Sequence, residues 1–243
     1  MLTRKQLYDL ADPALPTARA EERQILIDLL AIEPHHVICD DPAWGGYLGE
    51  GLIGRVRDPK QIICVEPSVT FAAGINNAFT VHRAQQDQIP LADASVDRAA
   101  SMVGLHHLPD KLGFIREMVR VLKPGGRIAF SEVSEDTAVA RFLNGAVHRY
   151  ATNGHRGMFV REGTCRQLLV DAGCTDIRET FHVLHWVFAS ETEMARFCYG
   201  LLGLSKATET QVLAAIHEYF AVEIVDGKVK LPWSLFYCVG SKC

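Results

Sequence analysis

The stretch V-I-C-D-D-P-A-W-G-G, residues 37–46, decides how the fold is interpreted. Three apolar residues run into two acids, and Pro42, Gly45 and Gly46 then interrupt the pattern. Such a run predicts a buried strand that ends in a tight turn. A helix is expected to follow over residues 47–56. Strand, glycine turn and helix open the nucleotide-binding α/β domains, although many glycine turns are plain loops.

A second apolar run, residues 61–65, ends at Glu66 and Pro67. Glu66 lies 20 residues beyond Gly46 (66 − 46 = 20). In nucleotide-binding sheets an acid at this spacing follows the second parallel strand and accepts hydrogen bonds from ribose hydroxyls. The alternative is a solvated glutamate at a strand end. The spacing favours the sugar-binding role, because a carboxylate can accept two hydrogen bonds from a vicinal diol.

Helices and strands alternate over the first half of the chain. Strands are expected at 36–40, 61–65, 80–84, 98–103 and 127–133. Helices are expected at 47–56 and 71–79. A further helix is expected where Ile115, Met118, Val119 and Leu122 share one face, and K-P-G-G at 123–126 ends it. This alternation predicts an α/β fold with a doubly wound, mostly parallel sheet covered on both faces. The ligand is expected at the carboxyl ends of the strands, near the point where the strand order reverses.

The chain is expected to hold an N-terminal helical cap, residues 1–34, and an α/β domain, residues 35–243. The cap is interpreted as two helices separated by residues 12–16; it packs on a sheet edge or forms one wall of a substrate pocket. Further helices are expected at 138–150, 164–171, 191–204 and 209–222, and further strands at 175–188 and 228–239, with a turn at Asp226 and Gly227 before the last strand. The segment 189–226 is therefore a helical insertion, expected to cover the pocket mouth.

Composition limits the class of ligand. The 243 residues carry a net charge of −4 and no dense Lys/Arg run, which disfavours nucleic acid and makes a small molecule the expected ligand. The 7 cysteines are odd in number and form no C-x-x-C pair, so buried free thiols in a reducing, cytoplasmic compartment are expected. No secretory segment and no apolar run long enough for a membrane span is recognised.

Three later motifs resemble one family. They are I-P-L-A-D-A-S-V-D at 89–97, against L-P-F-x-D-x-S-F-D; L-H-H-L-P-D at 105–110; and R-V-L-K-P-G-G-R-I at 120–128. Together they resemble the class I S-adenosylmethionine-dependent methyltransferases, in particular the small-molecule group that includes ubiquinone-biosynthesis-type enzymes. The resemblance covers roughly residues 35–185. It implies a seven-stranded Rossmann-like sheet with an antiparallel last strand, S-adenosylmethionine as cofactor and S-adenosylhomocysteine as product.

The first motif of that family, D-x-G-x-G-x-G, is only partly present. Asp40 matches its acid and Gly46 its last glycine, whereas Pro42 and Trp44 stand where the first two glycines belong. Those glycines let the backbone touch the cofactor without a Cβ in the way. Two outcomes are open: the loop bends outward, or the cofactor sits differently.

The resemblance implies the other cofactor contacts as well. Glu66 matches the ribose-binding acid, and Gln85 stands where the family has an acid near the adenine amino group. A glutamine carbonyl can still accept from that group, and Gln86 or Asp87 is an alternative partner. The complete expected cofactor set is Asp40, Gly45, Gly46, Glu66, Pro67, Gln85, Gln86 and Val103.

His106 and His107 are the candidate catalytic residues, because they follow the fourth strand beside the expected methyl position. A histidine titrates near neutrality and, as a general base, accelerates a reaction by about 10²–10⁴-fold. The alternative is that one caps a helix while the other packs. No H-E-x-x-H pattern and no His/Cys pair at zinc spacing occurs, so no metal site is expected.

The acceptor side is less defined. The residues where the family's acceptor pocket can begin are His148, His155, Arg156 and Arg161, and either arginine could hold a carboxylate bidentately or simply be solvated. Aromatic residues flank or lie in the insertion: Trp186, Phe188, Phe197, Tyr199, Tyr219 and Phe220. They form core, or they indicate an apolar or aromatic acceptor.

The functional hypothesis is methyl transfer from S-adenosylmethionine to the O, N or C nucleophile of a small molecule, by a monomer or homodimer. The alternative is a protein of the same fold that has lost methyl transfer and acts in another reaction or as a binding partner; Pro42 and Trp44 motivate it. A nicotinamide-dependent oxidoreductase would need G-x-G-x-x-G at the first turn, which is absent.

Overall fold

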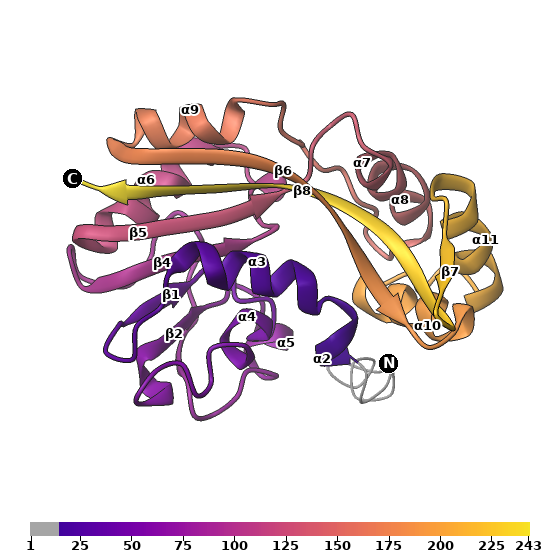
Figure 1. Cartoon of the computed structure of the whole chain (residues 1–243), viewed down its shortest axis with the longest axis horizontal. Coiled ribbons are helices and arrows are strands. Elements are labelled where there is room, and N and C mark those ends of the chain that lie inside the picture. Colours follow the sequence, from indigo (N-terminus) through magenta and orange to yellow (C-terminus); the bar gives the residue numbers. More distant parts are fainter. Residues whose placement is uncertain (1–14) are drawn as a thin grey trace.

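The structure is a computed structural model that describes residues 15–243. Its centre is one sheet in the order β3-β2-β1-β4-β5-β8-β6, with β7 paired to β8 (Figure 1). The strands are β1 (Ile38–Asp40), β2 (Ile62–Val65), β3 (Thr80–His82), β4 (Val96–Met102), β5 (Leu122–Glu132), β6 (Cys174–Phe188), β7 (Glu223–Val225) and β8 (Lys228–Lys242). The first helix expected in the N-terminal cap precedes Asp12 and lies outside the described residues.

The strand directions agree with the expected topology. β1 pairs in parallel with β2 on one side and with β4 on the other, and β3 and β5 extend this parallel part. β8 runs antiparallel between β5 and β6. The predicted α/β fold with a mostly parallel sheet and an antiparallel last strand is therefore confirmed. The chain order reverses at β1 and β4, which is where such sheets bind ligands.

An eighth strand, β7, was not expected. It forms a hairpin with β8, in which Val225 is opposite Lys228. Asp226 and Gly227, the expected turn, both adopt positive φ (52° and 70°), as a two-residue hairpin turn requires. The sequence predicted the turn but not the short strand that precedes it.

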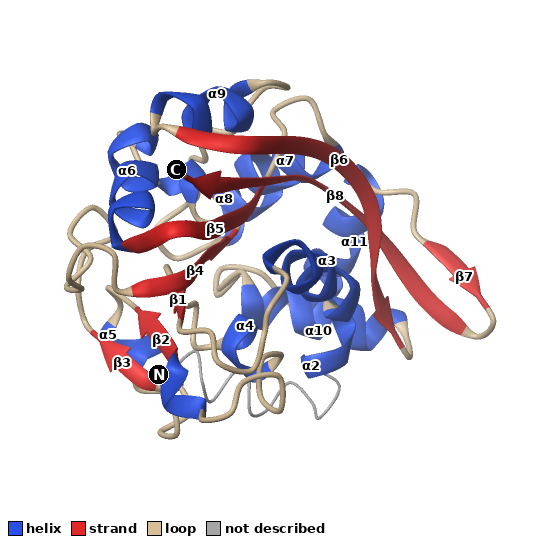
Figure 2. Cartoon of the chain, turned by 60° about the vertical axis from the view of Figure 1, so that its left-hand side comes forward, coloured by secondary structure: helices blue, strands red, loops and turns tan. Residues whose placement is uncertain are grey.

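The sheet buries a separate apolar cluster on each face. Ile38 belongs to one cluster and its neighbour Cys39 to the other, as the alternation of a strand demands. α3 (Ala20–Leu30) buries Leu26, Ile27 and Leu30 against the first face. α6 (Lys111–Val121) and α9 (Thr164–Asp171) cover the second (Figure 2). The sheet is thus covered on both sides.

Two helices near the first strands are shorter than expected. α4 (Tyr47–Glu50) was expected to reach residue 56, but Gly51 and Gly54 follow it, and Gly54 adopts φ +79°. The helix expected at 71–79 is one turn, α5 (Val69–Ala72). The Asn76 side chain accepts the Ala78 N–H at 3.0 Å, and this local turn competes with helix. Short 3₁₀ turns occur at Pro59–Gln61 and Leu105–His107.

The remaining helices fall where they were expected. A continuous helical run over 138–150 contains α7 (Ala138–Phe142), a π-turn (Leu143–Val147) and α8 (His148–Tyr150). π-turns are rare and often occur at functional sites. A short helix, α2 (Leu15–Ala18), precedes α3.

The long strands β6 and β8 extend past the ends of the parallel strands, and the helical insertion connects them (Figure 1). Its helices are α10 (Glu191–Leu201) and α11 (Glu209–Tyr219), each three residues shorter than expected. Within residues 15–243, no helix combines the length and apolar character that crossing a lipid bilayer requires.

Candidate functional site

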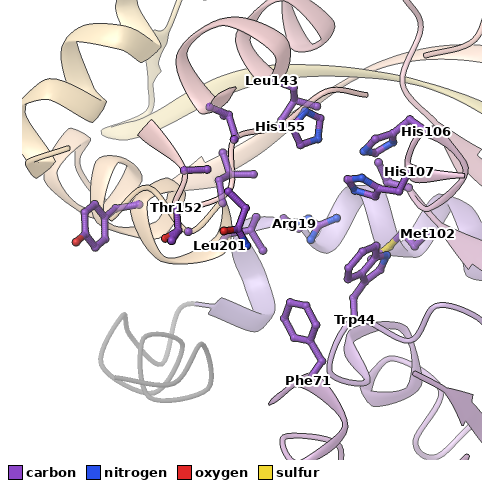
Figure 3. A pocket seen from close by; sticks show the side chains of 18 of the residues that line it. Arg19, Trp44, Phe71, Met102, His106, His107, Leu143, Thr152, His155 and Leu201 are labelled. Atoms are coloured by element: carbon purple, nitrogen blue, oxygen red, sulfur yellow. The ribbon is translucent and has the colours of Figure 1, made fainter. Parts of the chain in front are cut away.

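A cavity of about 700 Å³ opens beside the carboxyl ends of β1 and β4 (Figure 3). Its lining includes Arg19, Glu22, Trp44, Phe71, Met102, Val103, His106, His107, Leu143, Val147, His155, Trp186, Tyr199, Leu201 and Trp233. The volume lies within the usual range for small-molecule sites, about 300–1,000 Å³. α10 and the loop after it form the wall opposite the sheet, so the expectation that the insertion covers the pocket agrees with the geometry.

The turn after β1 places an indole at the cavity wall. Trp44, Gly45 and Gly46 all adopt positive φ (47°, 83° and 85°). Trp44 is therefore a bulky residue in a conformation that suits glycine. Its ring meets Phe71 edge-on at 5.6 Å and His107 at 5.7 Å between centroids. At the ends of β1 and β2 the wall consists of Trp44 and Phe71.

Three acids lie buried at the same strand ends. Glu66 is 0% exposed, does not line the cavity, and accepts the Ser68 N–H on Oε1 at 2.9 Å. Asp40 and Asp41 are also buried, and none of their four carboxylate oxygens has a hydrogen-bond partner among residues 15–243. Burial, together with the charge of Glu66, raises the pKa of both aspartates well above its usual value. The carboxyls of Asp40 and Asp41 are therefore acceptors that need hydrogen-bond donors or protons.

S-adenosylmethionine has donors of the kind this corner lacks, in its ribose hydroxyls and its amino group. Acceptor-only carboxylates match them chemically. The carboxyls of Asp40 and Asp41 therefore match the donor groups of the cofactor in chemical type, and they lie at the switch point between β1 and β4. Contact with Asp40 or Glu66 requires Trp44 and Phe71 to move apart, because these two form the wall there.

The structure brings together only some of the residues predicted for the site. Val103, His106 and His107 line the cavity. Asp40, Gly45, Gly46, Glu66, Pro67, Gln85 and Gln86 are outside its lining. Gln85 is exposed, and the Gln86 Nε2 is buried without a hydrogen-bond partner among residues 15–243. Their cofactor roles stay predictions.

A buried His–Glu pair stands on the other side of the cavity. His106 follows β4 and Glu132 ends β5; the two side chains are 3% and 0% exposed. The His106 Nδ1 lies 2.7 Å from the Glu132 Oε1, and the His106 backbone N–H donates to Oε2 at 2.9 Å. Burial alone would raise the pKa of Glu132, but the imidazole beside it and two backbone N–H donors bring it below its usual value. Glu132 thus stays ionised and fixes the ring orientation of His106.

Two further histidines complete a cluster with His106. The His106 ring centroid lies 4.0 Å from that of His107 and 5.4 Å from that of His155. His155 comes from the loop after α8, where its Nδ1 lies 3.2 Å from the Asn144 Oδ1. Burial, and then the neighbouring His106, lower the pKa of His155 to about 4. The ring of His155 is therefore neutral at neutral pH, with a nitrogen lone pair available to a ligand and little tendency to take a proton.

An arginine–glutamate pair also lines the cavity. The Arg19 guanidinium bonds to both oxygens of Glu22, at 2.8 Å and 2.6 Å. Glu22 also accepts the Trp186 indole N–H at 2.8 Å. The guanidinium carbon lies 5.1 Å from the Trp186 ring, which stacks on Trp233 at 3.9 Å. This part of the cavity wall is therefore aromatic, and the charges of its arginine and glutamate balance.

The two arginines predicted as carboxylate ligands do not reach the cavity. Arg156 and Arg161 are exposed and outside the lining, and Arg161 forms an ion pair with Glu135. The sequence reasoning missed Arg19, Glu22 and Glu132. Glu132 ends a predicted strand beside the strand that precedes His106, so neighbouring strand ends could have indicated it.

Known proteins share the domain and the fold. Residues 47–130, a little over a third of the chain, match a family model described as a methyltransferase domain. A dimethylglycine N-methyltransferase from Parasynechococcus marenigrum is 40% identical over 134 residues, covering 52% of this chain and 48% of that protein. The chain spans about half the length of the curated relatives it matches.

Solved structures agree on the fold at low sequence identity. The YcgJ protein from Bacillus subtilis is similar with a TM-score of 0.65 and 14% identity, over 92% of this chain and 99% of that one. The cyclase SpnF has a TM-score of 0.59 and 16% identity, over 91% and 80%. Because a protein named as a cyclase shares the fold, the reaction has to be argued from the site.

Proposed function

We propose that this chain, which carries a methyltransferase domain on the class I methyltransferase fold, transfers a methyl group from S-adenosylmethionine to a small-molecule acceptor. The observation that carries the proposal is the cavity at the ends of β1 and β4, with the His106–Glu132 pair on its wall. The matched domain and the similar relatives support it. The low identity of the structural neighbours supports only the fold.

The cofactor supplies a methyl group already activated on a sulfonium, so the protein has to align the acceptor and exclude water. Alignment of this kind lowers a barrier by about 7–11 kcal/mol in the best model systems. We propose that Val103 and Met102, at the end of β4, flank the reacting end of the site. Asp40 and Glu66 receive donor groups of the cofactor once Trp44 and Phe71 part.

The acceptor nucleophile is proposed to lie against the histidine cluster. Glu132 is hydrogen-bonded to Nδ1 of His106, which leaves the other ring nitrogen, Nε2, for the acceptor. With Nδ1 engaged by Glu132, Nε2 is the ring nitrogen of His106 that would accept the proton of the acceptor as the methyl group is transferred.

The acceptor is proposed to be apolar or aromatic. Trp186, Tyr199, Leu201 and Leu143 line the cavity on the acceptor side. Among residues 15–243, the arginine in the lining is Arg19, and it forms an ion pair with Glu22. Such a wall favours burial of apolar surface over recognition of a highly charged molecule. We propose a monomer or a homodimer as the active form.

We propose the cytoplasm as the compartment. All seven cysteines are free thiols, and six of them are buried. Burial raises the pKa of the Cys39, Cys64 and Cys165 thiols, which leaves them unreactive. A reducing compartment is where such thiols persist.

Calorimetric titration with S-adenosylmethionine tests the proposal, followed by an acceptor screen with labelled methyl donor. We expect saturable binding with a dissociation constant in the micromolar range, about −8 kcal/mol. No binding at millimolar cofactor would favour the alternative, a protein of this fold with another reaction or a binding role.

A further inference from the structure

Three histidines converge at one corner of the cavity (Figure 3). One ring nitrogen from each of His106, His107 and His155 lies within 4.8 Å of the corresponding atoms of the other two. In a tetrahedral zinc site with Zn–N bonds of about 2.0–2.1 Å, neighbouring nitrogens are about 3.3 Å apart. The rings therefore have to approach one another by at most about 1.5 Å, within the reach of side-chain rotation.

The groups behind the rings orient them as metal ligands. The His106 Nδ1 bonds to the buried Glu132 at 2.7 Å, and the His155 Nδ1 faces the Asn144 Oδ1 at 3.2 Å. A ligating histidine almost always donates its other N–H to a carboxylate or another oxygen, which fixes the tautomer. With Nδ1 engaged in this way, Nε2 of both rings is left for a ligand.

Asn144 and the loop of His155 hold one another in place. The Asn144 Oδ1 also accepts the Gly157 N–H at 2.7 Å, and its Nδ2 donates to the Gly157 carbonyl at 3.0 Å. The His155 backbone N–H donates to the His148 Nδ1 at 3.1 Å. The loop that carries His155 is therefore fixed by four polar contacts, and the third ring is pre-positioned beside the other two.

We propose that His106, His107 and His155 bind a divalent transition-metal ion, with Glu132 and Asn144 as the oxygen acceptors that orient two of the three rings. A donor set of imidazoles only suits zinc, copper, iron or nickel rather than magnesium or calcium. Three protein ligands leave one position open, as catalytic zinc sites do. All three histidines line the cavity, so the open position faces the acceptor.

The role of the ion rests on the proposed function, whereas its binding does not. In a methyltransferase, the open position would hold an oxygen or nitrogen donor of the acceptor and favour its deprotonated form. Acceptors with a hydroxyl, phenol or carboxylate beside the methylated atom fit this arrangement best. This narrows the substrate class from any apolar molecule to one with a metal-binding donor.

A second cluster serves as an internal control. Glu33, His35 and His36 also lie close enough for a common ligand. There the His36 Nδ1 accepts the Glu33 backbone N–H at 2.9 Å, and His35 and Glu33 are largely exposed. That cluster lies outside the lining of the cavity, and among residues 15–243 no buried carboxylate is hydrogen-bonded to its rings.

The experiment measures zinc binding by the full chain without any methyl donor. The background variant is Cys243→Ser, which removes the exposed thiol. Protein stripped with a chelator is loaded with zinc and desalted, its metal content is measured by mass spectrometry, and its affinity by competition with a chromophoric chelator. Residues 1–14 contain no histidine or cysteine that would compete. We expect one zinc ion per chain. When cobalt replaces zinc, we expect visible absorption bands of the kind that a cobalt ion with a low coordination number gives.

Variants locate the ion. His107→Ala and His155→Ala should each weaken zinc binding at least tenfold; the His107 ring is exposed, so its removal leaves the core intact. Glu132→Gln should weaken binding by about 10–100-fold, as for other groups that orient a ligand. His35→Ala and His217→Ala, away from the cavity, should bind zinc as the background does.

Two results overturn the proposal: no retained zinc in the background protein, or retention that survives His107→Ala and His155→Ala. Loss of zinc in His35→Ala instead would assign the ion to the second cluster. A parallel titration of chelator-treated protein with S-adenosylmethionine separates this outcome from the proposed function. If the protein binds the cofactor but no zinc, only the proposal of the metal site is refuted. If it binds zinc but no cofactor, only the proposal of methyl transfer from S-adenosylmethionine is refuted.

Discussion

Replacing Trp44 with glycine tests how the first turn accommodates a cofactor. The family glycine at this position is a tryptophan here, and its indole forms the cavity wall with Phe71. If the cofactor must part these rings to reach Asp40 and Glu66, then binding includes the cost of breaking the contacts of the indole. The substitution removes that cost.

The magnitude follows from the contacts. The indole makes two edge-on ring contacts, with Phe71 at 5.6 Å and His107 at 5.7 Å. Each such contact contributes about 0.5–1.5 kcal/mol, so parting both costs about 1–3 kcal/mol. Trp44→Gly should therefore bind S-adenosylmethionine and S-adenosylhomocysteine about 5- to 150-fold more tightly.

Stability should change little in the same variant. A non-glycine residue at φ 47° costs about 1–2 kcal/mol, and glycine removes that strain. The lost ring contacts and the extra freedom of glycine in the unfolded chain act in the opposite direction by a similar amount. The urea midpoint should stay close to that of the natural chain, which separates an effect on binding from an effect on folding.

Calorimetry with both nucleosides is the assay, and Trp44→Phe is the matched control. Phenylalanine keeps a ring at the wall and the strained φ, so it should gain little affinity. The reasoning is refuted if Trp44→Gly binds no tighter than Trp44→Phe. Weaker binding would mean that the indole contacts the cofactor rather than standing in its way.

Three further predictions concern buried polar groups. Glu132→Gln should lose about 1.5–3 kcal/mol of unfolding free energy at pH 8, because charge-assisted bonds to His106 are lost. Since the pKa of Glu132 is lowered in the fold, the stability difference between the variant and the natural chain should persist above the usual pKa of a glutamate and shrink as acid protonates Glu132. Urea titrations at several pH values measure this difference. Asp41→Asn should raise the melting temperature at pH 8. Burial raises the pKa of Asp41, so ionisation of its carboxyl destabilises the fold as the pH rises through the raised pKa. The gain in melting temperature should therefore vanish near pH 4, where the carboxyl is protonated. Trp186→Phe should cost about 1–3 kcal/mol in urea unfolding, because the buried Glu22 loses a donor, whereas an unchanged midpoint would show that Arg19 alone satisfies it.

Sequence reasoning located the sheet because its signals are local. The apolar runs at residues 37–39 and 61–65 and the three motifs at 89–128 indicated a parallel sheet, and the structure agrees. The order of the strands is known only from the structure. Helix lengths near β1 and β2 were wrong because Gly51, Gly54 and the Asn76 turn end helices that apolar periodicity alone would continue.

The site was harder to predict because it joins distant segments. His155 is 48 residues beyond His107 (155 − 107 = 48), in a loop outside the helices and strands that the sequence predicted. No spacing rule for zinc covers that distance, and only the fold brings the rings to within 6 Å of one another. Likewise, the sequence identified Glu66 as an acid at a strand end, but the rings that stand at the wall beside it became apparent only in three dimensions.

A crystal structure with S-adenosylhomocysteine is the decisive test of whether the cofactor binds in this cavity. The account predicts the nucleoside in the cavity beside Val103, with the Trp44 and Phe71 rings separated and a ribose hydroxyl on the Glu66 carboxylate. A cavity that stays without nucleoside at millimolar ligand, with the indole in its present place, would contradict methyl transfer by this chain while leaving its fold unchanged.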